Sequence, residues 1–309
     1  MRIAILDDYQ DVALTFGDWD SLKADITVFT EPLDDVVKQL QGFEAVVAMR
    51  ERTQFTADVL DRLPDLKLLV STGKRNAAID VPAARRNGVV VSATGYIGEP
   101  TAEHTWALIL AASRNLPQEF RSMREGGWQT SVGTMLHGKT LGLLGLGRLG
   151  AGAAKIGQVF GMETIAWSQN LTPEKADPHG VTAVSKEDLF ARSDVLSIHL
   201  VLSDRSRGLV GADELAAMKP GALLVNTSRG PIVDEAALVE ALRRKAIRAA
   251  IDVYDTEPFP AAHPLRTLEN ATLTPHIGFV TREVYEIFYG DAVEDIAAFQ
   301  AGEPIRVME

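Results

Sequence analysis

The sequence predicts an α/β protein built from two doubly wound parallel sheets. Three observations support this prediction: the length, the alternation of short apolar runs with helical patterns, and the lack of polar residues at every second position of those runs. A chain of 309 residues is about twice the length of a typical domain. Runs rich in Val, Ile and Leu are typical of parallel strands that are buried on both faces.

The first hundred residues contain five apolar runs, and helical patterns lie between them at 33–40 and 56–63. This alternation predicts repeated strand–helix units and therefore a first parallel sheet. The expected strands are RIAIL (2–6), ITVF (26–29), AVVAM (45–49), LKLLV (66–70) and GVVVS (88–92).

The rest of the chain repeats this pattern after a longer helical segment at Thr101–Leu116, which Pro100 opens and which Thr101 can cap. A last helical stretch, Arg282–Ala301, is expected to return to the first domain. The strands expected in the second sheet are TLGLLG (140–145), TIAW (164–167), VLSIHL (195–200), ALLVN (222–226), IRAAIDVY (247–254) and ATLTP (271–275).

Composition excludes several classes of protein. A formal net charge of −11 disfavours nucleic acids and anionic membranes as partners. No apolar run approaches 18 residues. In the first residues, MRIAILDD, the apolar run before the two aspartates is too short for the apolar region of a signal peptide. We therefore expect a soluble, cytoplasmic protein. The absence of cysteine excludes disulfides, thiolate catalysis and cysteine-bound zinc.

A glycine-rich turn follows the first strand of the second series. Gly145, Gly147 and Gly150 form the pattern G-x-G-x-x-G between an apolar strand and an Ala-rich helix. The first glycine allows a tight turn, the second lets the backbone approach a pyrophosphate, and the third allows the helix and strand to pack closely. This context predicts a dinucleotide site rather than a purely structural turn.

The next strand ends without the carboxylate that binds the adenosine ribose in many such sites. Ser168 takes that position, and Gln169 and Asn170 follow it. A carboxylate would repel the additional phosphate of NADP, so its absence permits that cofactor, although no base stands beside Ser168. Lys175 and Arg148 are the bases close enough in sequence to serve. NADP and NAD both remain open, with a slight preference for NADP.

Four further polar residues each follow an apolar run: Arg229, Asp252, Glu257 and His276. Because the carboxyl ends of parallel strands meet at one edge of a sheet, these residues can lie together near the cofactor. Each can instead have an ordinary role, such as a surface ion pair for Arg229 or a solvated loop acid for Glu257.

In this order, the motifs resemble those of the D-isomer-specific 2-hydroxyacid dehydrogenases over nearly the whole chain. The resemblance implies a flavodoxin-like substrate domain from residues 1–100 and 281–309, a Rossmann dinucleotide-binding domain from residues 101–280, a cleft between them, and a homodimer. The matching motifs are STG (71–73), AEH (102–104), GLGRLG (145–150), SDVLSIHL (193–200), MKPGALLVNTSRG (218–230), DVYDTEP (252–258) and TPHIG (274–278).

The resemblance also implies roles for individual residues. Arg229 holds the substrate carboxylate and polarises the 2-oxo group. His276 exchanges a proton with the carbonyl oxygen, and Glu257 favours its imidazolium form, so reduction should slow as pH rises. Asp252 lies near the nicotinamide. The residues expected to bind the cofactor are Gly145, Gly147, Arg148, Leu149, Gly150, Ser168, Gln169, Asn170, His199, Thr227, Ser228, Asp252 and Gly278.

The loop after STG departs from the family, because Lys74 and Arg75 replace small residues next to Gly73. Arg50 and Arg52 occupy a neighbouring loop that lies over the substrate in relatives. Several positive groups at one pocket would suit a substrate with a second anionic group, such as a dicarboxylic or phosphorylated 2-oxo acid. Alternatively, two of these bases are solvated or paired with acids.

Three other functions remain possible. A hydrolase could use Ser228 with His276, but the sequence has no G-x-S-x-G elbow. Formate and phosphite dehydrogenases of the same superfamily share the arginine, glutamate and histidine. A binding protein on this fold, resembling corepressors that sense NADH, can also retain all three residues, so the residues alone do not exclude it.

Overall fold

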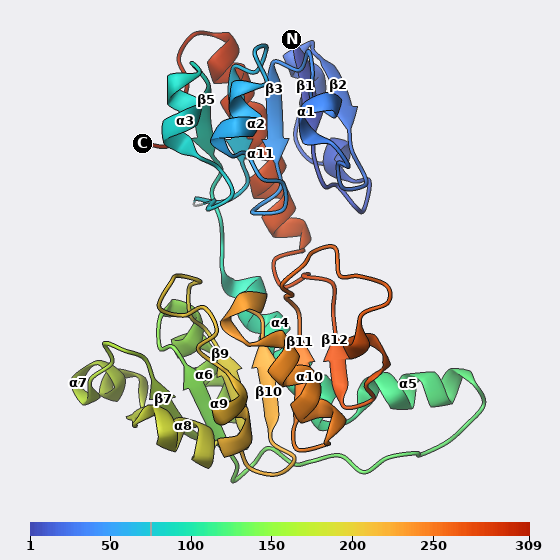
Figure 1. Cartoon of the computed structure of the whole chain (residues 1–309), viewed down its shortest axis with the longest axis vertical. Coiled ribbons are helices and arrows are strands. Elements are labelled where there is room, and N and C mark those ends of the chain that lie inside the picture. The colour runs from blue at the N-terminus through green and yellow to red at the C-terminus, as the bar shows by residue number, and fades with distance from the viewer. Residues whose placement is uncertain (75) are drawn as a thin grey trace. The chain divides into compact units, whose positions relative to one another are not determined.

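The computed structural model describes residues 1–74 and 76–309, and it divides the chain into two units. One unit contains residues 1–97 and 280–309, and the other contains residues 98–279. Each unit has its own sheet and its own buried core, and each is coloured by position along the chain in Figure 1. Among the described residues, no helix combines the length and apolar character that crossing a bilayer requires.

The unit formed by both ends of the chain has five parallel strands in the order β2-β1-β3-β4-β5. This is the flavodoxin-like order. Helix α11 (Arg282–Gln300) packs against β4, as expected for the last helical stretch. The other elements are β1 (Arg2–Ile5), η1 (Ala13–Thr15), η2 (Trp19–Leu22), β2 (Asp25–Val28), α1 (Val36–Gln39), β3 (Ala45–Ala48), α2 (Ala57–Asp61), β4 (Leu68–Ser71), α3 (Val81–Arg86) and β5 (Val90–Ala93).

The unit of residues 98–279 has seven parallel strands in the order β12-β11-β10-β9-β6-β7-β8. From the other edge, this is the Rossmann order extended by one strand. The strands are β6 (Thr140–Leu144), β7 (Glu163–Trp167), β8 (Thr182–Ala183), β9 (Val195–Ile198), β10 (Leu223–Asn226), β11 (Arg248–Ile251) and β12 (Ala271–Leu273). The predicted fold, two parallel doubly wound sheets, is therefore confirmed.

Two separate apolar cores cover the faces of this second sheet. One contains side chains of α8, α9 and α10, and the other contains side chains of α4 and α6. The helices of the unit are α4 (Glu99–Ser113), α5 (Leu116–Arg124), α6 (Arg148–Val159), α7 (Pro173–Ala176), η3 (Asp177–His179), α8 (Lys186–Arg192), α9 (Ala212–Ala217), η4 (Gly230–Ile232), α10 (Glu235–Arg243) and η5 (Pro264–Thr267).

The sequence prediction for the helix at Thr101–Leu116 is wrong in two respects. Helix α4 begins at Glu99 with Gly98 as its N-cap, so Thr101 lies inside the first turn and does not cap it. The helix ends at Ser113 because Asn115 adopts a left-handed conformation with φ +52°, and α5 starts after it. Asparagine tolerates that conformation better than most residues, which explains why the break falls there.

Candidate active site

The glycine-rich turn lies where the strand order of the Rossmann unit reverses, between β6 and β9. Gly145 has φ +106°, and a Cβ atom there would lie 2.8 Å from the carbonyl oxygen of His199. Gly147 is the N-cap of α6 and has no atom within 4 Å of its Cβ position. The first turn of α6 therefore has no side-chain cap, and its N–H groups can receive an anion.

The third glycine is required for packing, and its neighbour in the same helix provides a control. A Cβ atom on Gly150 would collide with the carbonyl oxygen of Gly145, whereas one on Gly152 would meet nothing within 4 Å. We expect Gly150→Ala to distort the turn and to weaken NAD(P)H binding at least tenfold in a fluorescence titration. Gly152→Ala should bind normally and gain up to about 1 kcal/mol of stability. Normal binding by Gly150→Ala would contradict the assignment of the turn.

The position expected to face the adenosine ribose lies directly after β7. Ser168 opens a turn there, because its carbonyl oxygen accepts a hydrogen bond from Leu171 N at 3.0 Å. Lys175 Nζ donates to the carbonyl oxygen of Asn170 at 3.1 Å, so its ammonium group reaches this turn. Arg148 instead lies 3.8 Å from the Glu99 carboxylate and is well exposed. Of the two bases considered from the sequence, Lys175 therefore contacts the turn that contains Ser168.

His199 follows β9 and lies against the glycine-rich turn. Its Nε2 atom is 3.0 Å from Ser197 Oγ, and burial lowers the pKa of His199 to about 4. The imidazole is therefore neutral at pH 7 and adds no positive charge to the predicted pyrophosphate site.

A depressed histidine pKa makes stability depend on pH. The unfolded state binds this proton near pH 6.5 and the folded state only near pH 4, so stability is lost as pH falls through that interval. We expect the free energy of unfolding to drop by about 2–3 kcal/mol from this residue between pH 7 and pH 4. Urea titrations of His199→Gln should show a drop smaller by that amount, and an unchanged drop would contradict the assignment.

Arg229 follows β10, and two hydrogen bonds of the Asn226 side chain hold the backbone of residues 228 and 229. Asn226 Nδ2 donates to the carbonyl oxygen of Arg229 at 2.9 Å, and Asn226 Oδ1 accepts from Ser228 N at 3.0 Å. The guanidinium also donates to the carbonyl oxygen of Ser228 at 2.7 Å. Ser228 Oγ donates to the carbonyl oxygen of Leu200 at 2.7 Å, so this hydroxyl is committed to the backbone and is a poor candidate for a hydrolase nucleophile.

Glu257 and His276 form a close pair. Glu257 follows β11, and His276 follows the neighbouring strand β12. His276 Nδ1 lies 2.5 Å from Glu257 Oε2, and Glu257 Oε1 accepts from Tyr254 N at 3.0 Å. Both side chains are largely buried. Because Nδ1 faces the carboxylate, Nε2 is the ring nitrogen left for proton exchange with a substrate. Strands β10, β11 and β12 are adjacent, so Arg229 and this pair follow neighbouring strands at one edge of the sheet.

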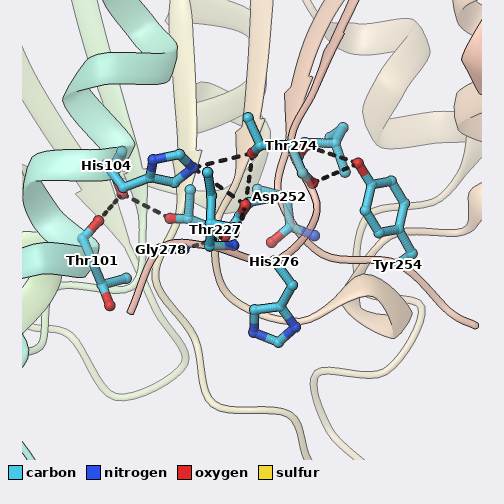
Figure 2. Close-up of polar contacts among 12 residues, drawn as sticks. Thr101, His104, Thr227, Asp252, Tyr254, Thr274, His276 and Gly278 are labelled. Carbon is cyan, nitrogen blue, oxygen red and sulfur yellow. Dashed lines mark hydrogen bonds and ion pairs between the residues drawn. The ribbon is translucent and has the colours of Figure 1, made fainter. Parts of the chain in front are cut away.

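Asp252, expected near the nicotinamide, lies at the centre of a polar network with the loop that carries His276 (Figure 2). Two members of this network, His104 and Thr274, were not among the residues predicted from sequence. Thr227 was predicted to bind the cofactor, and its Oγ1 atom lies 2.7 Å from Thr105 Oγ1. His104 and Thr105 both belong to α4, so this helix contacts the ends of three successive strands. The only sequence signal for His104 was its place in the AEH motif.

The remaining candidates belong to the unit formed by both ends of the chain. The Arg50 guanidinium lies over the Tyr96 ring at 5.0 Å, and its Nη1 atom is next to Gly73. Arg52 lies over the Tyr9 ring at 4.6 Å and donates to the carbonyl oxygen of Asp7 at 3.1 Å.

Lys74 is exposed and lines a pocket together with the C-terminal residues 306–309. Arg75 lies outside the described residues. No group of acidic or histidine side chains in the described part of the chain could hold a metal ion.

Comparison with known proteins assigns the chain to a family. Residues 106–278 match the family described as "D-isomer specific 2-hydroxyacid dehydrogenase, NAD binding domain". The chain belongs to this family. It is 38% identical to a glyoxylate reductase of Aeropyrum pernix, over 97% of this chain and 90% of that protein. It is also 36% identical to a D-3-phosphoglycerate dehydrogenase of Archaeoglobus fulgidus, over 99% of this chain but only 58% of that protein.

Solved structures of the family have the same fold over the whole chain. A phosphoglycerate oxidoreductase from Vibrio cholerae O395 gives a TM-score of 0.93 at 41% identity, covering 98% of this chain and 99% of that one. The apo structure of D-lactate dehydrogenase from Escherichia coli gives 0.85 at 25% identity, with both chains covered completely. The residues described above therefore lie in a dehydrogenase fold.

Proposed function

We propose that this family member transfers a hydride between NAD(P)H and C2 of a small 2-oxo acid, forming a D-2-hydroxy acid, and that it catalyses the reverse reaction. The observation that carries the proposal is the His276–Glu257 pair at 2.5 Å. Glu257 follows β11 and His276 follows β12, and β11 is the neighbour of β10, the strand that precedes Arg229. A proton donor and a guanidinium at one edge of the sheet are what reduction of a 2-oxo carboxylate needs.

The glycine-rich turn fits a dinucleotide, because Gly147 is open to solvent on its Cβ side and the first turn of α6 has no side-chain cap. Gly145, Gly147, Leu149 and Gly150 would hold the pyrophosphate, and Ser168 would face the adenosine ribose. The nicotinamide, when bound, supplies or accepts the hydride. The other residues expected to line this site are Arg148, Gln169, Asn170, His199, Thr227, Ser228, Asp252 and Gly278.

Three side chains of this unit act on the substrate or support the residue that does. Arg229 binds the substrate carboxylate through its planar fork and polarises the carbonyl group. His276 donates a proton from Nε2 to the carbonyl oxygen during reduction and accepts it during oxidation. Glu257 accepts from Nδ1, which fixes the ring orientation.

The test is consumption of NADH and NADPH with glyoxylate, pyruvate, hydroxypyruvate and 2-oxoglutarate. Turnover with any of these acids supports the proposal. Tight binding of NAD(P)H without turnover across a broader panel would favour a binding protein that senses the cofactor, and formate or phosphite oxidation would indicate the other branch of the superfamily.

The same panel tests whether the substrate has a second anionic group. We propose that Arg50 and Arg52 recognise such a group, with the backbone of Gly73 next to Arg50. Each of the first two guanidinium groups lies over a tyrosine ring, which holds its planar face in a fixed orientation. A higher kcat/KM for 2-oxoglutarate or a phosphorylated 2-oxo acid is expected. Preference for an unbranched monocarboxylate would contradict this proposal.

The cofactor is proposed to be NADP, with Lys175 as the base that contacts the turn after β7. We expect Ser168→Asp to raise the KM for NADPH about tenfold or more, because its carboxylate would repel the 2′-phosphate. The KM for NADH should change less. Steady-state titrations of both cofactors provide the measurement. Unchanged NADPH kinetics would contradict the proposed preference for NADP.

A cytoplasmic location stays a prediction. We also propose that the protein forms a homodimer. Helix α5 and the loop after it extend away from the sheet of their unit (Figure 1). They expose large apolar side chains, with exposed fractions from 56% to 93%. Exposed apolar surface of this kind is typical of protein–protein interfaces. A molar mass near twice 33.5 kDa by light scattering is expected. These side chains are Phe120, Met123, Trp128, Val132 and Met135.

A further inference from the structure

The carboxylate of Asp252 holds the loop that carries His276. Asp252 follows β11 and is 1% exposed. Its Oδ1 atom accepts from Thr274 Oγ1 at 2.6 Å and from Ile277 N at 2.9 Å, and its Oδ2 atom accepts from Gly278 N at 2.9 Å. These three contacts tie one short segment, residues 274–278, to a single buried side chain.

The loop needs such support because of its backbone. His276 has φ +53°, a left-handed conformation that is uncommon for a residue other than glycine. The two N–H groups directly after it are the ones that Asp252 binds. A Cβ atom on Gly278 would lie 3.0 Å from Asp252 Oδ2, so the carboxylate and the loop backbone are in close contact.

His104 approaches the same carboxylate from helix α4 (Figure 2). Its Nε2 atom lies 3.2 Å from Asp252 Oδ1 and 3.1 Å from Thr274 Oγ1, and its side chain is 16% exposed. No other role in the proposed reaction falls to this residue.

The geometry decides which nitrogen of His104 carries a proton. A carboxylate only accepts, so the Thr274 hydroxyl must donate across its 2.6 Å contact with Asp252. The Thr274 oxygen can then accept a second hydrogen bond. Only a protonated Nε2 on His104 satisfies both of its neighbours, because an unprotonated Nε2 would direct its lone pair at the carboxylate.

The donors also keep Asp252 ionised. Burial by itself would raise the pKa of Asp252, but hydrogen bonds from His104 and Thr274 outweigh burial and hold it below its ordinary value. The ionised form is the one that can accept all four contacts at once. Removing the His104 donor would weaken this arrangement even though His104 touches neither Ile277 nor Gly278 through any hydrogen bond described above.

We propose that His104 is a positioning residue, which acts through Asp252 to hold residues 274–278 and so keeps the His276 imidazole in its reactive orientation. The expected effect on turnover rests on the proposed dehydrogenase function, whereas the effect on the loop does not. Small displacements of a proton donor lower the rate of the chemical step far more than they change substrate binding.

The first readout is hydrogen–deuterium exchange of the amides of Ile277 and Gly278, which requires no activity. We compare the wild type with His104→Leu, which removes the donor, and with His104→Gln, which offers an N–H at similar reach. His179→Leu, a substitution of an exposed histidine in the same unit, is the control. His104→Leu should exchange these amides about tenfold faster. His104→Gln and the control should stay within about threefold of the wild type.

The second readout is the kinetics of 2-oxo acid reduction. His104→Leu should lower kcat about ten- to a hundredfold, with the KM for NAD(P)H within about twofold, and His104→Gln should recover most of the rate. In a double-mutant cycle, His104→Leu should have little further effect once Asp252→Asn is present, because both act on the same contact. If His104→Leu does not fold, Thr274→Val, which removes the other side-chain donor to Asp252, is measured in its place.

Unchanged exchange at Ile277 and Gly278 in the donor-free variants would overturn the positioning role. Equal impairment of His104→Leu and His104→Gln would overturn it as well, since it would indicate packing alone. Absence of turnover in the wild type would instead contradict the proposed function and leave the exchange result valid.

Discussion

Replacing Arg229 with lysine is expected to lower kcat/KM for a 2-oxo acid by about a hundredfold, and replacing it with alanine by about a thousandfold. Lysine keeps the charge but has no planar fork, so it cannot hold a carboxylate through two parallel hydrogen bonds. The backbone of Arg229 is fixed by Asn226, so neither substitution should disturb the strand ends. Steady-state kinetics at saturating cofactor provide the measurement.

Arg243→Lys is the matched control, because Arg243 is an exposed arginine of the same unit that pairs with Glu240 at 2.7 Å. It should behave like the wild type. If Arg229→Lys kept its kcat/KM within about twofold, the guanidinium would not be the group that binds the substrate carboxylate.

His276→Asn is expected to lower kcat for reduction by about a thousandfold while NAD(P)H binding is retained. Asparagine is chosen because it tolerates the left-handed backbone that His276 adopts with φ +53°. The wild-type reduction rate should fall as pH rises, since the imidazolium form supplies the proton. The variant should lose this dependence because no group replaces the donor.

A second histidine–carboxylate pair in the same unit offers a close control. His263 Nε2 lies 2.9 Å from Glu235 Oε1, and the two side chains are 18% and 25% exposed, against 17% and 24% for His276 and Glu257. His263→Asn should leave both the rate and its pH profile unchanged. A comparable loss in both variants would point to a general structural effect and against proton transfer by His276.

The sheets could be predicted from sequence because parallel strands buried on both faces need continuous runs of Val, Ile and Leu. Strand β8 was missed, since its two residues, Thr182 and Ala183, form no apolar run. The break between α4 and α5 was also missed, because Asn115 interrupts the helix through its backbone conformation while the surrounding residues keep a helical pattern.

The candidate site was predictable only in part. Arg229, Glu257 and His276 stand out because each follows an apolar run, and topology places such positions at one edge of a sheet. The contribution of His104 could not be found in this way. It lies about 150 residues before Asp252 in sequence and depends on how α4 crosses the ends of β11 and β12, which is a property of the packed sheet.

The division of the chain has a consequence for how such enzymes can diversify. Arg229, Glu257 and His276 all come from residues 98–279, whereas Arg50 and Arg52 come from the unit that begins and ends the chain. On the proposed role of Arg50 and Arg52 in substrate recognition, mutation of the terminal unit would change which acids are accepted, while the residues proposed to transfer the proton stay unchanged. Directed evolution of new substrate ranges in this chain should accordingly begin with Arg50, Arg52 and their tyrosine neighbours.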